Sequence, residues 1–235
     1  MTMEKMGIII YARTTSRRLP GKVLKVLNNK KMLLELVYDR VKKKSKDILI
    51  IVNTSKNTQD NKIITFCKKK KIKYFRGKLD DVFERTVECC KKYKLKSFVR
   101  VNADRPFFDY NLMETMIKIF KKKNYDIVTN QFPRACPKGL ACEIAKTKIF
   151  LDIKKKNITK AEKEHIFKYF YKKNSKYKIK NYVSKVYNKN KKINLSIDTK
   201  KDFKITEKIY NKYKNNFFID AKKIINNYKD LTSWN

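Results

Sequence analysis

The sequence is poor in the residues from which several specialised kinds of protein are built. Its 235 residues include one histidine, four glycines and four prolines, and its five cysteines form no CxxC pair. A zinc site made of closely spaced cysteines and histidines is therefore excluded, as are collagen-like and disulfide-scaffold proteins. No apolar run approaches the ~20 residues that a membrane-spanning helix needs. The hydrophobic fraction of 42% nevertheless suffices for a core, which excludes a wholly disordered chain.

The first residues also lack the basic stretch and long apolar segment of a secretory signal peptide. Without such a signal we expect a cytoplasmic protein. Its five cysteines, an odd number, should then be reduced thiols that are mostly buried. The length suits a single domain.

Negative charge is scarce, with 22 Asp and Glu against 61 Lys and Arg and a formal net charge of +39. Such a charge first suggests nucleic-acid binding. Only nine of the 61 cations are arginine, however, and the 52 lysines are spread along the chain. A selected phosphate-binding surface favours arginine for its bidentate grip, whereas Lys, Asn, Ile and Tyr are the residues that A- and T-rich codons encode. We therefore interpret the charge as mainly compositional. We expect no specific nucleic-acid partner, only weak and salt-sensitive binding.

Hydrophobic periodicity predicts alternating strands and helices over the first 130 residues. Short β-branched runs predict strands, and apolar residues at helical spacing predict helices. The predicted strands are 6–11, 47–52, 72–75, 98–101 and 125–129, and the predicted helices are 32–44, 61–71, 80–93 and, capped by Asn111, 111–121. This alternation is typical of a parallel sheet with crossover helices.

The pattern changes in the second part of the chain. Residues 132–140 carry two prolines and a glycine and predict a loop. Further predicted strands are 142–145, 177–183 and 193–197, and further predicted helices are 161–172, 199–212 and 220–228. Because no repeat or linker interrupts the chain, we predict one α/β domain over residues 1–235, with a mostly parallel mixed sheet flanked by helices.

Phosphate-binding chemistry is concentrated directly after the first predicted strand. Residues 12–22 are ARTTSRRLPGK, which includes three of the nine arginines (Arg13, Arg17 and Arg18) and ends at Lys22. Open α/β sheets bind ligands at the carboxyl ends of their strands, and clustered cations beside backbone N–H groups suit a triphosphate. The glycine spacing of a Walker A loop is missing. The alternative is a basic loop that merely faces solvent.

Two aspartates also follow predicted strands. Asp104 comes after the strand at 98–101, and Asp198 comes after the strand at 193–197. Because strand ends converge on one crevice, the two carboxylates can meet around a hard cation, and Mg²⁺ accepts one or two carboxylates together with phosphate oxygens. Spacing alone leaves two alternatives open, a helix N-cap for Asp198 and a turn residue before Arg-Pro for Asp104.

The loop motif resembles the N-terminal signature of cytidylyltransferases that make CMP-activated acidic sugars, a pattern close to AR-x-x-S-x-RLPGK. The likeness is greatest to the acylneuraminate and spore-coat polysaccharide cytidylyltransferase-like branch. Further similar segments follow in family order over nearly the whole chain: FRG at 75–77 with DDV at 80–82, VRVNADRP at 99–106, PKGL at 137–140, EH at 164–165, and IDT at 197–199 with DF at 202–203.

The resemblance implies a single GT-A-like, Rossmann-like nucleotidyltransferase domain. Residues up to about 130 would form its nucleotide-binding half, and residues from about 131 to 235 its sugar-side and closing half. The implied activity is Mg²⁺-dependent transfer of CMP from CTP to a nonulosonate- or Kdo-like sugar acid, with release of pyrophosphate, for surface-glycan biosynthesis. The implied partners are CTP and the sugar acid, with no membrane span, and a homodimer is left open.

Roles for individual residues follow from the same resemblance. The implied catalytic residues are Lys22, Asp104 and Asp198, of which the two aspartates hold Mg²⁺; the implied nucleotide-binding residues are Arg13, Ser16, Arg18, Lys22, Arg100 and Asn102; and the sugar-side candidates are Glu143, Glu164 and His165. Three of these have structural alternatives. Arg100 would be half of a buried ion pair, Glu143 would only end a strand, and His165 would be a surface or packing residue.

Two other functions are compatible with parts of the sequence. One is a GT-A glycosyltransferase or another sugar nucleotidyltransferase. The RLPGK segment favours nucleotidyl transfer, whereas likeness of fold alone does not distinguish these activities. The other is a non-enzymatic basic module that binds nucleic acid. The scattered lysines and the lack of aromatic recognition motifs count against that module.

Overall fold

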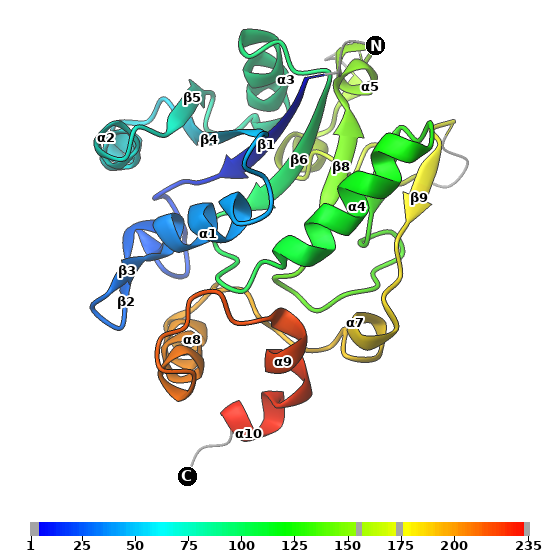
Figure 1. The fold of residues 1–235 in the computed structure, drawn as a ribbon. Coiled ribbons are helices and arrows are strands. Elements are labelled where there is room, and N and C mark those ends of the chain that lie inside the picture. The colour runs from blue at the N-terminus through cyan, green and yellow to red at the C-terminus, as the bar shows by residue number, and fades with distance from the viewer. Residues whose placement is uncertain (1–4, 154–156, 173–175, 233–235) are drawn as a thin grey trace.

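A seven-stranded sheet runs through the middle of the protein in the computed structural model, which describes residues 5–153, 157–172 and 176–232 (Figure 1). The strand order is β5-β4-β1-β6-β8-β7-β9. The strands are β1 (Met6–Tyr11), β4 (Leu49–Ser55), β5 (Lys73–Gly77), β6 (Ser97–Asn102), β7 (Ile127–Thr129), β8 (Glu143–Lys146) and β9 (Ile179–Asn181). The neighbours from β5 to β6 pair in parallel, and β8 runs antiparallel to both β6 and β7. This confirms the predicted mixed, mostly parallel sheet.

The central strand β1 is buried on both faces. Ile8, Ile9 and Ile10 are each 0% exposed, and they alternate between two hydrophobic cores on opposite sides of the sheet. Strands that are covered on both faces are continuously apolar rather than alternating. The run MGIIIY therefore forms a strand at the centre of the sheet, and the loop that follows it begins where several strands end.

Helices cover both faces of the sheet. The core that contains Ile8 and Ile10 is completed by α1 (Leu33–Lys42), α2 (Asn61–Lys69), α4 (Tyr110–Lys122), α8 (Lys200–Lys212) and α9 (Ala221–Asn226). The opposite core is completed by α3 (Val82–Lys92), α5 (Thr147–Leu151) and the segment around α6 (Lys160–Glu164). All five cysteines are free and buried, as predicted.

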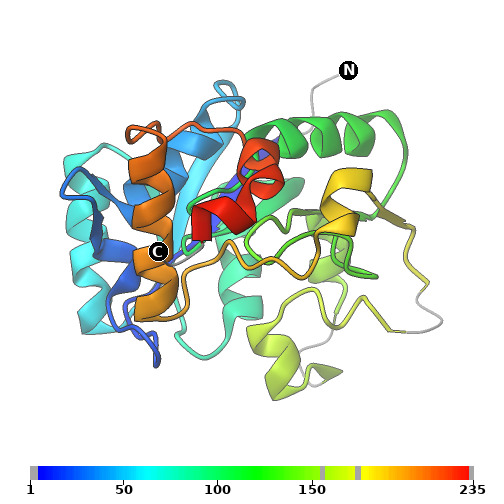
Figure 2. The ribbon, with the colours of Figure 1, turned by 90° about the horizontal axis from the view of Figure 1, so that it is seen from below.

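The C-terminal helices lie beyond the end of the sheet at which β1 and β6 finish. Figure 2 shows α8, α9 and α10 (Tyr228–Thr232), coloured orange and red, in front of that end. Smaller elements complete the chain: a hairpin of β2 (Val26–Leu27) and β3 (Lys31–Met32), the helix α7 (Lys185–Lys189), and 3₁₀ turns at Lys22–Leu24 and Thr58–Asp60. None of the helices in the described part of the chain is long and apolar enough to cross a membrane.

The predicted strand at 193–197 is wrong. Asn194 makes one isolated bridge with Lys138, and the segment is otherwise held by loops. The N–H of Leu195 donates to the carbonyl of Lys138 at 2.7 Å, and the N–H of Ile197 donates to the carbonyl of Asp104 at 2.9 Å. Apolar and polar residues alternate in this segment, which imitated a strand, yet Leu195, Ser196 and Ile197 are all buried.

Several helix boundaries also differ from prediction; the predicted helix at 220–228, for example, ends at Asn226, and α10 begins at Tyr228. The predicted helix at 161–172 ends at Glu164, because His165 adopts φ −104° and ψ 76°, and the chain continues in turns. The apolar spacing that suggested a longer helix comes from Phe167 and Phe170, which pack in an aromatic cluster with Phe150. The N-cap of α4 is Asp109 rather than Asn111. The Asp109 carboxylate accepts a hydrogen bond from the N–H of Asn111 at 2.8 Å.

Arg40 on α1 joins distant segments from inside the core. It is 0% exposed, and its Nε donates to the carbonyl of Phe108 at 2.9 Å. Its Nη1 donates to the carbonyls of Phe217 at 2.7 Å and Ile219 at 3.1 Å. A buried cation and buried carbonyls are both costly to leave without partners. Arg40 therefore ties α1 to the loop after β6 and to the chain between α8 and α9.

We predict that Arg40→Met lowers the free energy of unfolding by about 3 kcal/mol, since several buried carbonyls lose a charged donor. The matched control is Lys42→Met, an exposed position on the same helix, where the change should stay within about 0.5 kcal/mol. Urea unfolding followed by circular dichroism measures both. Equal midpoints for the two variants would show that Arg40 does not hold these segments.

Candidate active site

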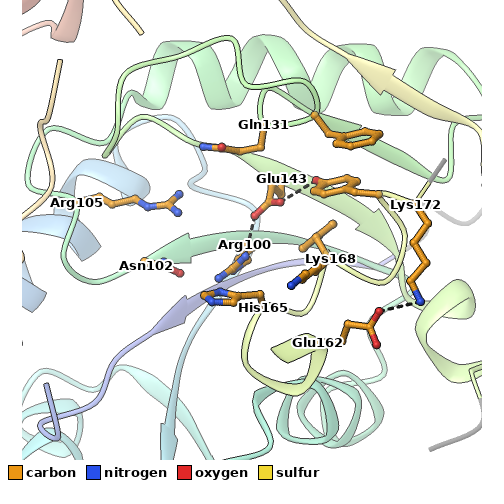
Figure 3. A pocket seen from close by; sticks show the side chains of 12 residues that line it. Arg100, Asn102, Arg105, Gln131, Glu143, Glu162, His165, Lys168 and Lys172 are labelled. Atoms are coloured by element: carbon orange, nitrogen blue, oxygen red, sulfur yellow. Dashed lines mark hydrogen bonds and ion pairs between the residues drawn. The ribbon is translucent and has the colours of Figure 1, made fainter. Parts of the chain in front are cut away.

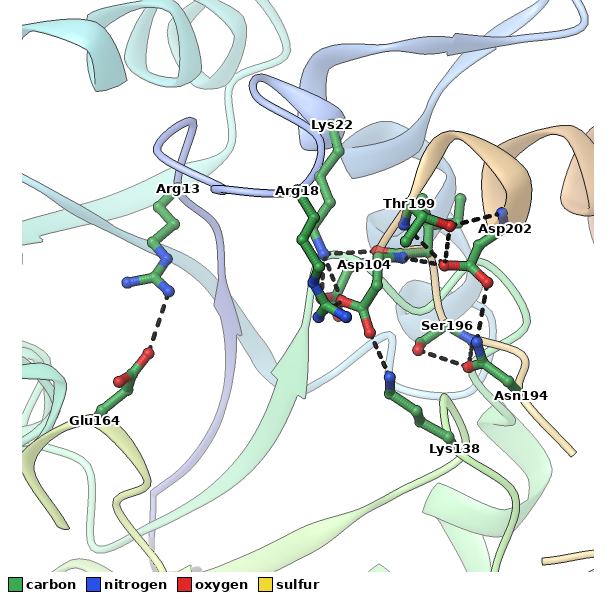
Figure 4. A network of polar contacts seen from close by, with 12 residues as sticks. Arg13, Arg18, Lys22, Asp104, Lys138, Glu164, Asn194, Ser196, Thr199 and Asp202 are labelled. Carbon is green, nitrogen blue, oxygen red and sulfur yellow. Dashed lines mark hydrogen bonds and ion pairs between the residues drawn. The ribbon is translucent and has the colours of Figure 1, made fainter. Parts of the chain in front are cut away.

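The ammonium group of Lys22 lies between two carboxylates from distant parts of the chain (Figure 4). Its Nζ donates to Asp104 Oδ2 at 2.8 Å and to Asp198 Oδ1 at 3.2 Å. It also donates to the carbonyl of Ile197 at 2.6 Å. The Lys22 residue is only 7% exposed. Three predicted catalytic residues are thus brought together where the loop after β1, the turn after β6 and the segment before α8 meet.

The loop that delivers Lys22 is anchored by a buried carboxylate that sequence analysis missed. Asp60 is 0% exposed and accepts from the N–H of Thr14 at 2.8 Å and from its hydroxyl at 2.7 Å. Burial alone would raise the pKa of Asp60, but hydrogen bonds from Ser55 and Thr14 hold it below its ordinary value. Asp60 directly precedes α2, and no local motif marks it as the anchor of a loop 46 residues earlier in the chain.

A left-handed glycine closes the same loop. Gly21 has φ 67°, a conformation that other residues rarely adopt, and its N–H donates to the carbonyl of Thr14 at 2.8 Å. The next residue, Lys22, opens a 3₁₀ turn and points back into the protein. The Pro-Gly-Lys end of the motif therefore determines where the ammonium group lies.

Asp198 is surrounded by cations. Besides Lys22, Arg18 Nη2 lies 3.1 Å from its Oδ1, and Lys138 Nζ forms an ion pair with its Oδ2. Burial alone would raise the pKa of Asp198, but the ammonium groups of Lys138 and Lys22 outweigh it and lower the pKa. The carboxylate is therefore ionised and attracts positive charge.

The helix-capping alternative for Asp198 is wrong. The neighbouring Thr199 caps α8, accepting from the N–H of Asp202, while the Asp202 carboxylate accepts from the N–H of Thr199 at 2.8 Å. This capping box leaves the Asp198 side chain to the cation cluster. Asp104 likewise does more than form a turn, because its side chain faces Lys22 and its carbonyl holds Ile197.

Lys138 is a second contributor that sequence reasoning did not single out. Its backbone is fixed against the segment before α8, since its N–H donates to the carbonyl of Ile193 at 3.0 Å. The next residue, Gly139, has φ 98°, and a Cβ there would meet the carbonyl carbon of Leu195 at 2.5 Å. Glycine is therefore required for this close approach, which brings Lys138 to Asp198.

The two aspartates fit a magnesium site. No group of three or more His, Cys, Asp and Glu side chains that could cage a metal occurs in the described part of the chain. Two carboxylates that already share one cation, however, are hard oxygen donors of the kind that Mg²⁺ takes together with phosphate oxygens. Such a pair suits a metal that arrives with a nucleotide rather than one held by protein alone.

Arg13 and Ser16 are not part of this cluster. Figure 4 shows Arg13 turned away, with its Nη2 3.2 Å from Glu164 Oε1. Both side chains of that pair are about half exposed, so the contact stabilises the protein little. Ser16 is half-buried, and its N–H donates within the loop to the carbonyl of Thr14.

A cavity of about 620 Å³ opens beside the cluster (Figure 3). Its polar lining includes Arg100 and Asn102 from β6, Glu143 from β8, and His165 at the end of α6. Aromatic side chains form part of the wall. Two of the three sugar-side candidates, Glu143 and His165, thus line the cavity, whereas the third, Glu164, pairs with the loop after β1.

Glu143 is held from two sides at the base of this cavity. It is 4% exposed, its Oε2 lies 2.9 Å from Arg100 Nη1, and its Oε1 accepts from the Tyr171 hydroxyl at 2.7 Å. Burial, together with the neighbouring carboxylate, raises the pKa of Tyr171, which therefore stays a donor. The ion-pair alternative for Arg100 is thus confirmed, and the pair faces the cavity.

Comparison with known sequences identifies a family and several relatives of this chain. A family model described as cytidylyltransferase matches residues 7–224. The chain is 32% identical over 203 residues to an uncharacterized protein of Methanocaldococcus jannaschii, covering 86% of this chain and 82% of that protein. It is 28% identical over 218 residues to the spore coat polysaccharide biosynthesis protein SpsF of Bacillus subtilis, covering 89% and 88%. A 3-deoxy-manno-octulosonate cytidylyltransferase of Wigglesworthia glossinidia brevipalpis is 29% identical over 131 residues, covering 54% and 51%.

A solved structure agrees with these relatives. A cytidylyltransferase from Leptospira borgpetersenii matches with a TM-score of 0.88 and 25% identity over 98% of each chain. The family match extends from β1 into α9 and includes both the Lys22 cluster and the cavity beside it. The chain therefore belongs to the cytidylyltransferase family.

Proposed function

We propose that this protein transfers CMP from CTP to a hydroxyl group of a sugar acid and releases pyrophosphate. The observation that supports this most strongly is the contact of Lys22 with both Asp104 and Asp198. Phosphate-binding cations and a pair of metal-binding carboxylates then lie in one place, as a metal–nucleotide substrate requires. Family membership favours transfer of a cytidylyl group over glycosyl transfer and over a nucleic-acid-binding module without enzymatic activity.

The reaction is an in-line substitution at phosphorus. The acceptor hydroxyl oxygen forms a bond to the α-phosphorus of CTP, and the bond from that phosphorus to the oxygen bridging to the β-phosphate breaks. Pyrophosphate leaves with the bridging oxygen, and the hydroxyl proton passes to water. Charge develops on the phosphoryl oxygens, so catalysis depends on positioned positive charge rather than on a protein nucleophile.

Lys22 and Arg18 are the residues proposed to bind the phosphates. In the free protein their charges are neutralised by Asp198, and phosphate oxygens would replace part of that contact. Asp104 and Asp198 would hold Mg²⁺, which supplies additional positive charge at the phosphates when bound. Arg13 is half exposed and weakly paired, so its side chain can turn from Glu164 to the nucleotide.

The cavity is proposed to bind the acceptor. It lies along β6, whose residues Arg100 and Asn102 line it, and the chain then continues directly to Asp104. Asn102 Oδ1 is buried and has no hydrogen-bond partner in the described part of the chain, so it can accept from a ligand. Together with Glu143 and His165 it offers the mixed donors and acceptors that sugar hydroxyls need. Ser16 stays a predicted nucleotide contact.

Similarity to relatives supports the acceptor class. The Wigglesworthia relative is named for an octulosonate, a sugar acid, and the Bacillus relative is named for spore coat polysaccharide biosynthesis. We therefore propose a surface-glycan precursor as acceptor and a cytoplasmic location, where CTP is available. A homodimer stays a prediction.

We expect Asp104→Asn and Asp198→Asn to lower the turnover number at least about 100-fold, because charge on the α-phosphate and the leaving pyrophosphate would be uncompensated. The measurement is pyrophosphate release with CTP, Mg²⁺ and a panel of sugar acids. Asp39→Asn, outside the cluster on α1, is the matched control and should stay within about twofold. Near-native, Mg²⁺-dependent rates in either site variant would contradict the proposed metal site.

CTP binding tests the loop separately from catalysis. Arg18→Ala should weaken CTP binding by about 2–3 kcal/mol, the size of a lost charge-assisted contact. Arg17→Ala is the matched control, an exposed arginine in the same loop, for which we expect less than about 0.5 kcal/mol. Isothermal titration measures both. Equal affinities for the two variants would rule out Arg18 as a phosphate ligand.

A further inference from the structure

Arg105 is a buried cation with most of its donors unused. It directly follows Asp104, is 9% exposed, and turns its guanidinium group into the 620 Å³ cavity (Figure 3). Within the described residues its side chain makes a single hydrogen bond, from Nη1 to the carbonyl of Ala141, and no ion pair. A guanidinium group carries five N–H donors and stays charged in proteins. Arg105 was part of a motif in the sequence but had no assigned role.

The carboxylates near Arg105 are already engaged. Glu143 uses one oxygen for Arg100 and the other for Tyr171. Asp104 accepts from Lys22. Glu162, which is also buried, is paired with the exposed Lys172 at 2.9 Å. Arg100, Arg105 and Glu143 together leave one positive charge among the buried side chains of the cavity, and the exposed Lys168, which also lines it, adds to that charge. An uncompensated buried charge is costly, so the arrangement favours a bound anion.

We propose that Arg105 binds the carboxylate of the acceptor and selects acidic sugars over neutral ones. The assignment rests on the proposed function, since it concerns the acceptor of that reaction. The planar fork of a guanidinium group matches the two oxygens of a carboxylate. A monoanion meets less repulsion than a phosphate dianion from Glu143 and from the carbonyl of Ala141, which lie beside the two arginines.

The position of Arg105 also orients the acceptor. Arg105 and Asp104 are adjacent residues on the turn after β6, one facing the cavity and the other facing Lys22. In a 2-keto sugar acid the carboxylate is attached to the carbon that bears the anomeric hydroxyl. Holding that carboxylate at Arg105 therefore holds the hydroxyl on the side of the cavity nearest the phosphate-binding cluster. A neutral sugar would lack this anchor and would leave the buried charge unpaired.

The test compares wild-type protein with Arg105→Gln, Arg105→Lys and the control Arg134→Gln. Arg134 is an exposed arginine that also donates to a backbone carbonyl, that of Cys136, and lies outside the cavity lining. Each protein is given CTP, Mg²⁺ and N-acetylneuraminate or 3-deoxy-manno-octulosonate, and pyrophosphate release yields kcat and KM. The C1 carboxamides of both acids and a sugar phosphate form the further arms. Titration with CTP alone shows whether each variant is folded.

For Arg105→Gln we expect the acceptor KM to rise about 10- to 100-fold, the range for a lost hydrogen bond between charged groups. The KM for CTP should change less than about twofold, because Arg105 faces the acceptor. Arg105→Lys should show a smaller rise in the acceptor KM than Arg105→Gln, and Arg134→Gln should match wild type. The ratio of kcat/KM for acid over carboxamide should be large in wild type and fall towards one in Arg105→Gln, which a merely structural role would not produce.

Three results would overturn the assignment. An unchanged acid-to-carboxamide ratio in Arg105→Gln removes Arg105 as the carboxylate anchor and leaves the proposed function intact. Wild-type turnover of the sugar phosphate in preference to the acids shows that the anion is a phosphate. Wild-type protein that binds CTP but releases pyrophosphate with none of the acids refutes the proposed acceptor class, and the carboxylate anchor with it.

Discussion

The bridge from Lys22 to Asp104 and Asp198 is the interaction on which the site depends. Without a cation between them, two carboxylates at one end of the sheet would repel each other, and burial would favour their neutral forms. The same ammonium group also holds the carbonyl of Ile197 and so fixes the segment that leads into α8. The irregular segment before α8 is thus held in place by the ammonium group of Lys22. The same contacts stabilise the fold and position the residues of the candidate site.

The cations around Asp198 can leave this carboxylate for the phosphates of a bound nucleotide. Asp198 carries three cations in the free protein, of which Arg18 has a side chain that is 64% exposed and Lys138 one that is 46% exposed. Exposed ion pairs are weak and their members rearrange readily, whereas Lys22, with a side chain that is 9% exposed, is firmly held. A triphosphate can therefore take over Arg18 and Lys138 and approach Lys22 while Lys22 keeps its contact with Asp104. The free protein also avoids an open, strongly negative pocket.

The sequence predicted the parallel half of this protein better than the rest. Buried strands in a parallel sheet are short, continuous β-branched runs, so β1 was predicted with its observed bounds, together with the basic loop after it. The segment at 193–197 was misassigned because apolar and polar residues alternate there as they do in a strand, whereas tertiary contacts hold it as an irregular segment. Asp60 and Lys138 were missed for a related reason. Each acts through a residue far away in sequence, and local composition does not record such partners.

Arginine, rather than total positive charge, marks the organised contacts of this lysine-rich chain. Of nine arginines, Arg40 and Arg85 lie in the core and bind backbone carbonyls with their forked donors, and Arg100 pairs with Glu143 beside Arg105 in the cavity. Lysine is a point charge on a flexible stem and cannot replace a planar group that bonds in several directions. Surface lysines, unlike Lys22 and Lys138, can therefore vary with composition, while the buried arginines stay tied to geometry. In a chain with this bias, a buried arginine with unused donors is a stronger indication of a ligand than any cluster of surface lysines, which is why Arg105 points to the acceptor.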